Sequence, residues 1–237
     1  MKLSLYEEGA CEYYTLGLSK SRARSIFSHF FFGHYYFEEC DSLYVYNPGF
    51  VQNIWGNIEV KNIPNYSENI EILNLLNNVF DYKEKLLLPC REKVIILEQA
   101  FATENDEKNQ EKLISHIAEI VGSENIIIKL HPRSGEGKYA GKYRTIKTSI
   151  PLELLIANEI NIDKIFISVS SSATLNLKLI FDIEPYIIIL NRLGRSDENL
   201  TTGDKLYSRI QQSCRENHFF IPHTLGELDK ILMSIYA

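Results

Sequence analysis

The sequence predicts a doubly wound α/β domain that extends from about residue 92 to residue 237. Two observations indicate this fold. Continuous apolar runs rich in β-branched residues recur along this region, and such runs are typical of strands buried on both faces of a parallel sheet. Segments with apolar residues at helical spacing lie between the runs, and strands that alternate with helices form right-handed βαβ units.

The expected strands of this domain are the apolar runs themselves. In chain order they are Val94–Leu97, Ile126–Leu130, Ile165–Val169, Tyr186–Leu190 and the shorter Phe219–Ile221. The most apolar stretch, from Ile183 to Leu190, has the length of a strand and is too short to cross a membrane.

The expected helices lie between these runs. Lys108–Val121 places its apolar residues on one helical face, and Ser172–Phe181 is a second candidate. Pro151 suits the first turn of a helix that follows it. Thr224 and Glu227 have the spacing of a capping box, which predicts that the last helix of the chain begins there.

The first 90 residues follow a different pattern. Leu3–Gly9 and Ser42–Gly49 are expected to be strands that end in turns, and a helical segment follows around Glu68–Phe80. Two strands of this kind do not form a stable sheet alone. We therefore interpret this region as part of a lobe whose other strands are absent.

The composition is that of a soluble globular protein, with 45% hydrophobic and 24% charged residues among 237. The net charge of −6 argues against a general nucleic-acid-binding protein. Cys11, Cys40, Cys90 and Cys214 lie far apart, so we expect free thiols and no zinc site. Acidic residues precede any apolar run at the N-terminus, unlike a secretory signal, and we expect a cytoplasmic protein.

Three short motifs carry the residue types that chemistry needs. Tyr6–Gly9 places two carboxylates at a predicted strand end, and Lys129–Arg133 and Ser168–Thr174 follow two strands of the larger domain. Ligands of open α/β sheets bind outside the carboxyl ends of the strands. We therefore expect the imidazole of the second motif and the hydroxyls of the third to meet at adjacent strand ends.

The second and third motifs together fit an anionic ligand. Pro132 disfavours helical backbone at His131, so the imidazole projects from the strand end. Histidine acts as an acid near neutral pH or carries positive charge, and Lys129 adds a second charge on the same strand face. A serine-rich helix start offers hydroxyls and backbone N–H groups to a phosphate. A carboxylate such as Glu8, across a cleft, would deprotonate an attacking hydroxyl.

Each motif also has an ordinary structural interpretation. A His-Pro pair after a strand forms a turn, serine is a common helix N-cap, and paired glutamates before glycine form a solvated turn. The basic side chains after the second motif either bind phosphate or an acidic acceptor, or they cover a solvated loop. They are Arg133, Lys138, Lys142, Arg144 and Lys147. The order and placement of the three motifs favour the functional interpretation.

The motifs resemble those of the bacterial sialyltransferases of glycosyltransferase families 38, 52 and 80. These families share an acidic pair followed by glycine, a His-Pro motif and a Ser-Ser or Ser-Thr motif. The corresponding residues here are, in the same order, Glu7-Glu8-Gly9, His131-Pro132 and Ser171-Ser172. The segment that begins at Pro151 is similar to the one that supplies a carboxylate to the nucleotide's ribose.

The resemblance implies a GT-B fold, with a partial N-terminal α/β lobe at residues 1–88 and a complete Rossmann-like domain at residues 89–237. It implies an inverting, metal-independent transfer of sialic acid from CMP-sialic acid to a terminal sugar hydroxyl of a bacterial surface glycan, lipooligosaccharide or capsule. No cofactor is expected, and the expected partners are this donor and an oligosaccharide acceptor.

The resemblance also implies roles for single residues. Glu8 would be the general base, with Glu7 as the alternative, and His131 would be the acid that supports the leaving phosphate. In family 52 the base follows the strand before the His-Pro strand, which would move that role toward Glu104 or Asp106. The residues expected to bind the donor are Lys129, Pro132, Glu153, Ser171 and Ser172.

Family members have a full N-terminal lobe, whereas this sequence begins at its acidic motif. We therefore expect exposed sheet edges that pair with a second copy in a homodimer, and a peripheral association with the inner membrane. Three alternatives stay open: a polysialyltransferase, a non-catalytic nucleotide-binding remnant or subunit of a split glycosyltransferase, and an interaction module.

Overall fold

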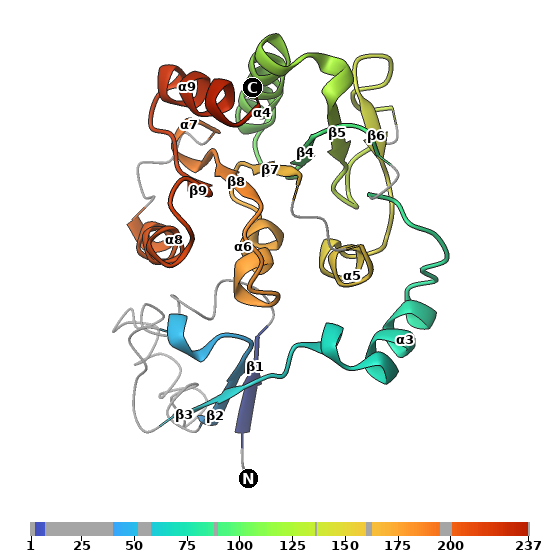
Figure 1. The fold of residues 1–237 in the computed structure, drawn as a ribbon, viewed down its shortest axis with the longest axis vertical. Coiled ribbons are helices and arrows are strands. Elements are labelled where there is room, and N and C mark those ends of the chain that lie inside the picture. The colour runs from blue at the N-terminus through green and yellow to red at the C-terminus, as the bar shows by residue number, and fades with distance from the viewer. Residues whose placement is uncertain are drawn as a thin grey trace, which may run out of the picture.

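The computed structural model describes residues 3–7, 40–51, 58–87, 90–135, 137–159, 163–194 and 201–236. These residues form two separate parallel β-sheets, one near each end of the molecule as drawn in Figure 1, with helices between and around them. The predicted mixed α/β fold with parallel strands is confirmed.

The larger sheet has the strand order β6-β5-β4-β7-β8-β9, and every neighbouring pair is parallel. Numbered along the chain within this sheet, the order is 3-2-1-4-5-6, that of a doubly wound dinucleotide-binding fold. The order reverses between β4 and β7, so a crevice is expected outside their carboxyl ends. The strands are β4 (Val94–Leu97), β5 (Ile126–Lys129), β6 (Arg144–Ile146), β7 (Ile165–Ser168), β8 (Tyr186–Ile189) and β9 (Phe219–Phe220).

Helices cover both faces of this sheet, because alternate residues of each strand point to opposite sides. Ile95 and Leu97 of β4 belong to the apolar core beneath α5, α6 and α8, whereas Val94 and Ile96 belong to the core beneath α4 and α9. The bounds of these helices are α4 (Glu104–Val121), α5 (Leu152–Asn158), α6 (Ser172–Leu179), α8 (Thr201–Ser213) and α9 (Leu225–Tyr236). A four-residue helix, α7 (Asn191–Gly194), follows β8.

The smaller sheet contains three parallel strands in the order β1-β2-β3: Leu3–Tyr6, Cys40–Val45 and Glu59–Asn62. The sequence predicted the first two and missed β3, which has polar residues at alternate positions and no apolar run. Leu43 and Val45 of β2 are fully buried and share one core with the larger sheet. Burial against that core stabilises a sheet that would be marginal alone.

Local sequence signals place most helix boundaries. Thr103 caps α4 by accepting the Asp106 N–H at 3.2 Å, so this helix begins four residues earlier than predicted. Thr224 accepts the Glu227 N–H at 3.2 Å, as the predicted capping box requires, although the Glu227 carboxylate bonds the N–H of His223. Pro151 is the N-cap residue of α5 and not a residue of its first turn.

Several elements of the larger domain escaped prediction, among them strand β6 and helix α8. Strand β6 lies in the segment interpreted as a basic loop; its residue Arg144 binds both carboxylate oxygens of Glu92 at 3.1 Å. It pairs with β5 as an edge strand, where polar side chains face solvent and leave no apolar run. Helix α8 was also missed; its apolar residues Leu206 and Ile210 pack on the main core.

The two sheets are joined by α3 (Ile70–Val79) and the segment after it, and a single buried carboxylate fixes that segment. Glu159, which is 1% exposed, accepts hydrogen bonds from the Tyr82 hydroxyl at 3.1 Å, the Leu86 N–H at 2.9 Å and the Leu87 N–H at 2.7 Å. The side chains of Asn77 and Asn158 exchange two further hydrogen bonds between α3 and α5.

A second contact joins the lobes on the other side. Arg209 of α8 donates to the carbonyl oxygens of Gly49 at 2.6 Å and Phe50 at 2.9 Å, at the short helix η1 (Pro48–Phe50). Its guanidinium also lies over the Phe50 ring, 5.7 Å from the centroid. These contacts set the distance between the sheets from two sides.

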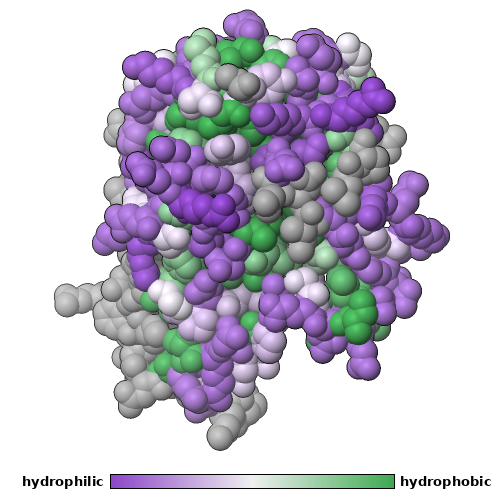
Figure 2. All heavy atoms as spheres, viewed as in Figure 1, coloured by the Kyte–Doolittle hydropathy of each residue, from purple (hydrophilic) through white to green (hydrophobic). Residues whose placement is uncertain are grey.

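Helix α3 is apolar on both sides. Leu73 is buried, while Ile70, Leu75 and Val79 are more than 60% exposed, and Figure 2 shows this apolar surface over the helix. Within the described residues, every helix is too short or too polar to cross a bilayer.

We expect Glu159→Ala to destabilise the protein by about 3 kcal/mol, because it leaves buried backbone N–H groups of residues 86 and 87 without an acceptor. Urea denaturation measures this change. Lys83→Ala, which removes only an exposed ion pair with Asp81, serves as the control and should cost well under about 1 kcal/mol. Equal stability of the two variants would contradict the role of Glu159.

Candidate functional site

The carboxyl end of β4 lies between the two motifs that were predicted to bind phosphate. His131 follows β5 and Ser171 follows β7, and β4 pairs with both of these strands. The two motifs were expected to follow adjacent strands. Instead, β4 separates their strands, so the motifs lie about 10 Å apart. The residues after β4, Glu98 and Gln99, fill the space between them.

Glu98 connects β4 to the His-Pro motif. Its side chain is fully buried; one carboxylate oxygen accepts the backbone N–H of His131 at 2.9 Å, and the other lies 2.7 Å from the Lys138 ammonium. A buried carboxylate is tolerated only with such partners. Because both oxygens are engaged, Glu98 holds His131 in place.

Gln99 connects β4 to the serine motif. Its side-chain oxygen accepts both the N–H of Ser170 at 3.1 Å and the hydroxyl of Ser170 at 3.0 Å. Its backbone exchanges two hydrogen bonds with the buried side chain of Gln110 in α4. Glu98 and Gln99, which are neighbours in one loop, thus each bind one of the two motifs that were predicted to bind an anion.

A tight turn fixes the His131 ring. The Ser134 N–H bonds the His131 carbonyl at 2.9 Å, with Pro132 at the second position of the turn, where proline is favoured. The Nδ1 atom of His131 accepts the N–H of Arg133 at 3.1 Å. The neutral ring therefore carries its proton on Nε2 and presents a hydrogen-bond donor.

The surroundings favour this neutral form. Partial burial, followed by the positive charge of Arg133, lowers the pKa of His131 below its ordinary 6.5; Lys129 acts in the same direction and the Glu98 carboxylate opposes it. His131 is thus better described in the free protein as a neutral donor than as a permanent cation.

The serine motif begins α6. Ser171 is the N-cap residue, yet its side chain makes no capping hydrogen bond, and Ser172 is an exposed first residue of the helix. The hydroxyl of Ser168, which is buried, accepts the Ser171 N–H at 3.3 Å and the Thr174 hydroxyl at 2.8 Å. Ser168 therefore shapes the turn, while the two predicted serines lie at the helix N-terminus where an anion is stabilised.

A cavity of about 340 Å³ lies between the two sheets and contains two of the predicted carboxylates. Glu7 enters it from the end of β1 and Glu153 from the first turn of α5. The other lining residues are Tyr46, Tyr66, Leu76, Phe80, Pro151, Leu154, Asn176 and Ile180. The volume is within the range of small-molecule sites, and the lining is apolar with a few polar groups, as such sites are.

Hydrogen bonds orient both carboxylates of this interlobe cavity. Glu7 accepts the backbone N–H of Tyr46 at 2.8 Å, and Glu153 accepts the side-chain amide of Asn176 at 2.8 Å. Burial raises the pKa of Tyr46, and the charges of Glu7 and Glu153 raise it further. Burial, with Glu153 next, also raises the pKa of Tyr66, so both phenols stay neutral hydrogen-bond donors.

Lys129, at the end of β5, lies within electrostatic reach of this cavity. Burial lowers the pKa of Lys129, and the Glu153 carboxylate opposes that shift. The chain thus brings Glu7 of the acidic motif, the α5 carboxylate Glu153 and the strand of the His-Pro motif to one region between the lobes.

Three of the residues considered for the base remain, Glu8, Glu104 and Asp106. Glu8 lies outside the described residues, so its role stays a prediction. Glu104 and Asp106 belong to the first turn of α4, where Glu104 pairs with Lys108 and Asp106 accepts the Thr103 hydroxyl. These contacts assign them to the helix terminus. Among the described residues, His, Cys, Asp and Glu nowhere form a group of three that could hold a metal ion.

Sequence reasoning missed Glu98, Gln99 and the two tyrosines of the interlobe cavity. A signal for Glu98 was present, since a carboxylate directly follows the apolar run Val94–Leu97. Tyr46 directly follows β2, at the same sheet edge as Glu7, but nothing in the local pattern indicated that β2 adjoins β1.

Comparison with known proteins gives one family. Residues 1–189 match the family model described as alpha-2,8-polysialyltransferase. No curated protein matches the chain. Among solved structures, the chain is similar to the GT-B domain of a sialyltransferase from Photobacterium damselae, with 11% identity, a TM-score of 0.42, and coverage of 99% of this chain and 69% of that one.

We expect Glu98→Gln to lower the pKa of His131 further, because the variant removes the negative charge that opposes the shift and leaves Lys138 with its positive charge. An NMR titration of His131 measures the change. Glu92→Gln is the matched control. Glu92 precedes the amino end of β4, is also buried, and pairs with Arg144. An unchanged or raised pKa of His131 in Glu98→Gln would refute the assignment.

Proposed function

Because the chain belongs to the alpha-2,8-polysialyltransferase family, and is therefore a glycosyltransferase that moves sialyl groups, we propose that it extends a sialylated glycan with CMP-sialic acid as donor. The family match over residues 1–189 is the observation that carries this proposal. It favours chain extension, the polysialyltransferase alternative, over transfer to a terminal galactose-like sugar.

The interlobe cavity and the neighbouring strand ends supply groups for such a transfer. The acceptor hydroxyl would attack the anomeric carbon of the donor sugar, and the bond from that carbon to the CMP phosphate oxygen would break. A single displacement inverts the anomeric centre. The hydroxyl proton would pass to a carboxylate of the acidic motif, Glu8 or, at the cavity wall, Glu7.

The leaving phosphate needs positive charge and hydrogen-bond donors. The Nε2–H of His131 is oriented as a donor, because Nδ1 is engaged by Arg133. Ser171, Ser172 and the N-terminus of α6 supply further donors on the other side of β4. Glu98 and Gln99 hold these two sets in fixed relative positions, so the phosphate would bridge them.

Lys129 and Glu153 complete the proposed donor site. Lys129 adds positive charge near the leaving group, and a carboxylate such as Glu153 accepts two hydroxyl hydrogen bonds, as a ribose diol requires. Asn176 orients Glu153 for this contact. All of these groups, side chains and the backbone N–H groups at the start of α6, belong to the protein itself, and the proposed transfer uses no cofactor.

We expect His131→Ala to reduce transfer from CMP-sialic acid by about 10²- to 10⁴-fold. The melting temperature should change little, because the His131 ring is partly exposed at a turn. Radiolabelled or chromatographic assays of product formation measure the loss, and His223→Ala, at an exposed histidine, is the control. In the same assay, whichever of Glu7→Gln and Glu8→Gln abolishes transfer identifies the base. Full activity of His131→Ala would exclude its role.

Replacing both Ser171 and Ser172 by alanine should weaken CMP binding by about tenfold, since each removes a donor to the phosphate. Helix α6 should persist, because Ser171 makes no capping bond to it. Calorimetric titration with CMP measures the affinity, with Ser234→Ala in α9 as the control. CMP binding without any turnover of CMP-sialic acid would favour the non-catalytic nucleotide-binding alternative.

A further inference from the structure

The strand order of the larger sheet reverses between β4 and β7, and one side chain spans this reversal. Gln99 is the second residue after β4, and its Oε1 atom accepts hydrogen bonds from Ser170, the second residue after β7. Ligands of open α/β sheets bind in the crevice at such a reversal, outside the carboxyl ends of the strands. Gln99 therefore lies where a ligand of the larger sheet is expected.

The contacts with Ser170 fix which way the Gln99 amide faces. A backbone N–H can only donate, so the atom that bonds the Ser170 N–H at 3.1 Å must be the carbonyl oxygen of the amide. The NH₂ group of Gln99 then keeps two N–H donors that have no partner among the residues that the structure describes. This nitrogen is not fully buried, so both donors are open to a ligand.

The backbone of Gln99 is also held in place. Its N–H donates to the side-chain oxygen of Gln110 at 2.9 Å, and its carbonyl accepts the side-chain amide of Gln110 at 3.0 Å. Gln110 lies in α4 and is only 2% exposed. Since α4 fixes the backbone and Ser170 fixes the carbonyl end of the side chain, the NH₂ group is preorganised. A preorganised donor loses less conformational entropy when it binds a ligand.

The position of this donor matches a gap in the proposed phosphate site. His131 and Ser171 follow strands that lie about 10 Å apart, whereas a charge-assisted hydrogen bond to a phosphate oxygen measures about 2.8 Å. A phosphate between the two motifs therefore faces the loop after β4. That loop presents Glu98, a carboxylate that is already paired with Lys138, and Gln99, whose amide can donate.

We propose that Gln99 binds the phosphate of the donor directly through its NH₂ group, from a position between His131 and the serine motif. The inference rests on the proposed function, since it takes the CMP part of the donor as the ligand. The carbonyl end of the amide would keep its contacts with Ser170. Because the phosphate gains negative charge as its bond to the sugar breaks, this donor would stabilise the transition state more than the bound substrate.

Two substitutions distinguish a contact with the phosphate from a role in positioning Ser170. Gln99→Glu keeps an acceptor for both hydrogen bonds of Ser170 but turns a negative oxygen toward the phosphate. Gln99→Lys loses that acceptor and offers a positive donor instead. We expect Gln99→Glu to have nearly the wild-type melting temperature and to bind CMP about 10- to 100-fold more weakly. Gln99→Lys should be less stable, yet bind CMP at least about tenfold more tightly than Gln99→Glu does.

Calorimetric titrations with CMP and with cytidine, which lacks the phosphate, measure these affinities without any donor sugar. Cytidine should bind the wild-type protein and Gln99→Glu with equal affinity, because the introduced charge acts on the phosphate alone. Gln211→Glu is the matched control, since it makes the same change of charge at an exposed glutamine of α8. It should leave the affinity for CMP as it is in the wild-type protein.

Three results would overturn the inference. They are wild-type CMP affinity in Gln99→Glu, an equal loss of CMP and cytidine affinity in that variant, and weaker CMP binding by Gln99→Lys than by Gln99→Glu. The last two are the results expected if Gln99 only positions the serine motif. Absence of transfer by the wild-type protein would instead refute the proposed function, while the titrations with CMP and cytidine would still decide on Gln99. A wild-type protein that binds no CMP would contradict both.

Discussion

The candidate site depends on the loop after β4, where one buried carboxylate and one amide hold two loops of the sheet together. Glu98 binds the backbone of His131, and Gln99 binds the backbone and hydroxyl of Ser170. Removing one partner from a buried charged pair is strongly destabilising, so Glu98 and Lys138 constrain the His-Pro turn firmly. The His-Pro and serine motifs are therefore held at a fixed separation in the ligand-free protein.

A fixed distance between the two sheets is the second requirement. Glu7 of the acidic motif follows a strand of the smaller sheet, and the His-Pro and serine motifs follow strands of the larger one. The cavity between the sheets therefore exists only while the lobes hold their positions. Glu159 secures the connecting segment on one side, and Arg209 secures η1 on the other. The shared apolar core, which includes Leu43 and Val45, adds burial that no single hydrogen bond could match.

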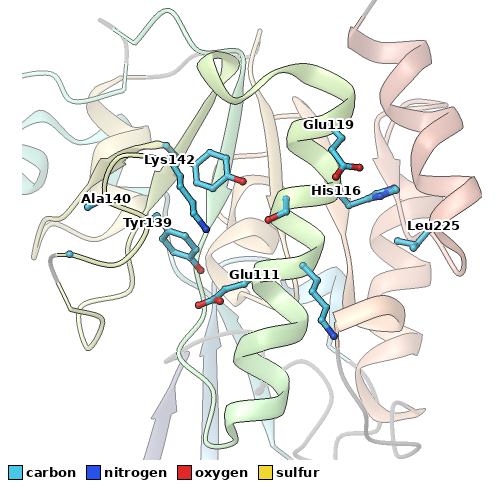
Figure 3. A pocket seen from close by; sticks show the side chains of 11 residues that line it. Glu111, His116, Glu119, Tyr139, Ala140, Lys142 and Leu225 are labelled. Carbon is cyan, nitrogen blue, oxygen red and sulfur yellow. The ribbon is translucent and has the colours of Figure 1, made fainter.

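The two faces of the larger sheet differ. The proposed donor site would lie on the face that meets the smaller sheet, and a hollow along α4 lies on the opposite face (Figure 3). The loop between β5 and β6 connects them, because Lys138 in that loop reaches Glu98. Tyr139 in this loop has a φ of +68°, which is unfavourable for a residue with a side chain. This backbone conformation is tolerated because the ion pair and the turn hydrogen bonds hold the loop in place.

The sequence alone determined the βαβ pattern, since buried parallel strands require continuous apolar runs such as Ile126–Leu130. It also located His131, Ser171 and Glu153 at strand or helix ends, because proline, serine and helix starts have local signatures. Edge strands β3 and β6 lacked such runs and were missed. Only the tertiary structure decided which strand ends are neighbours. Strand β4 separates the two motifs, and the Glu98 carboxylate accepts the backbone N–H of His131, 33 residues further along the chain. Strand order arises from packing of the whole chain, which no local pattern encodes.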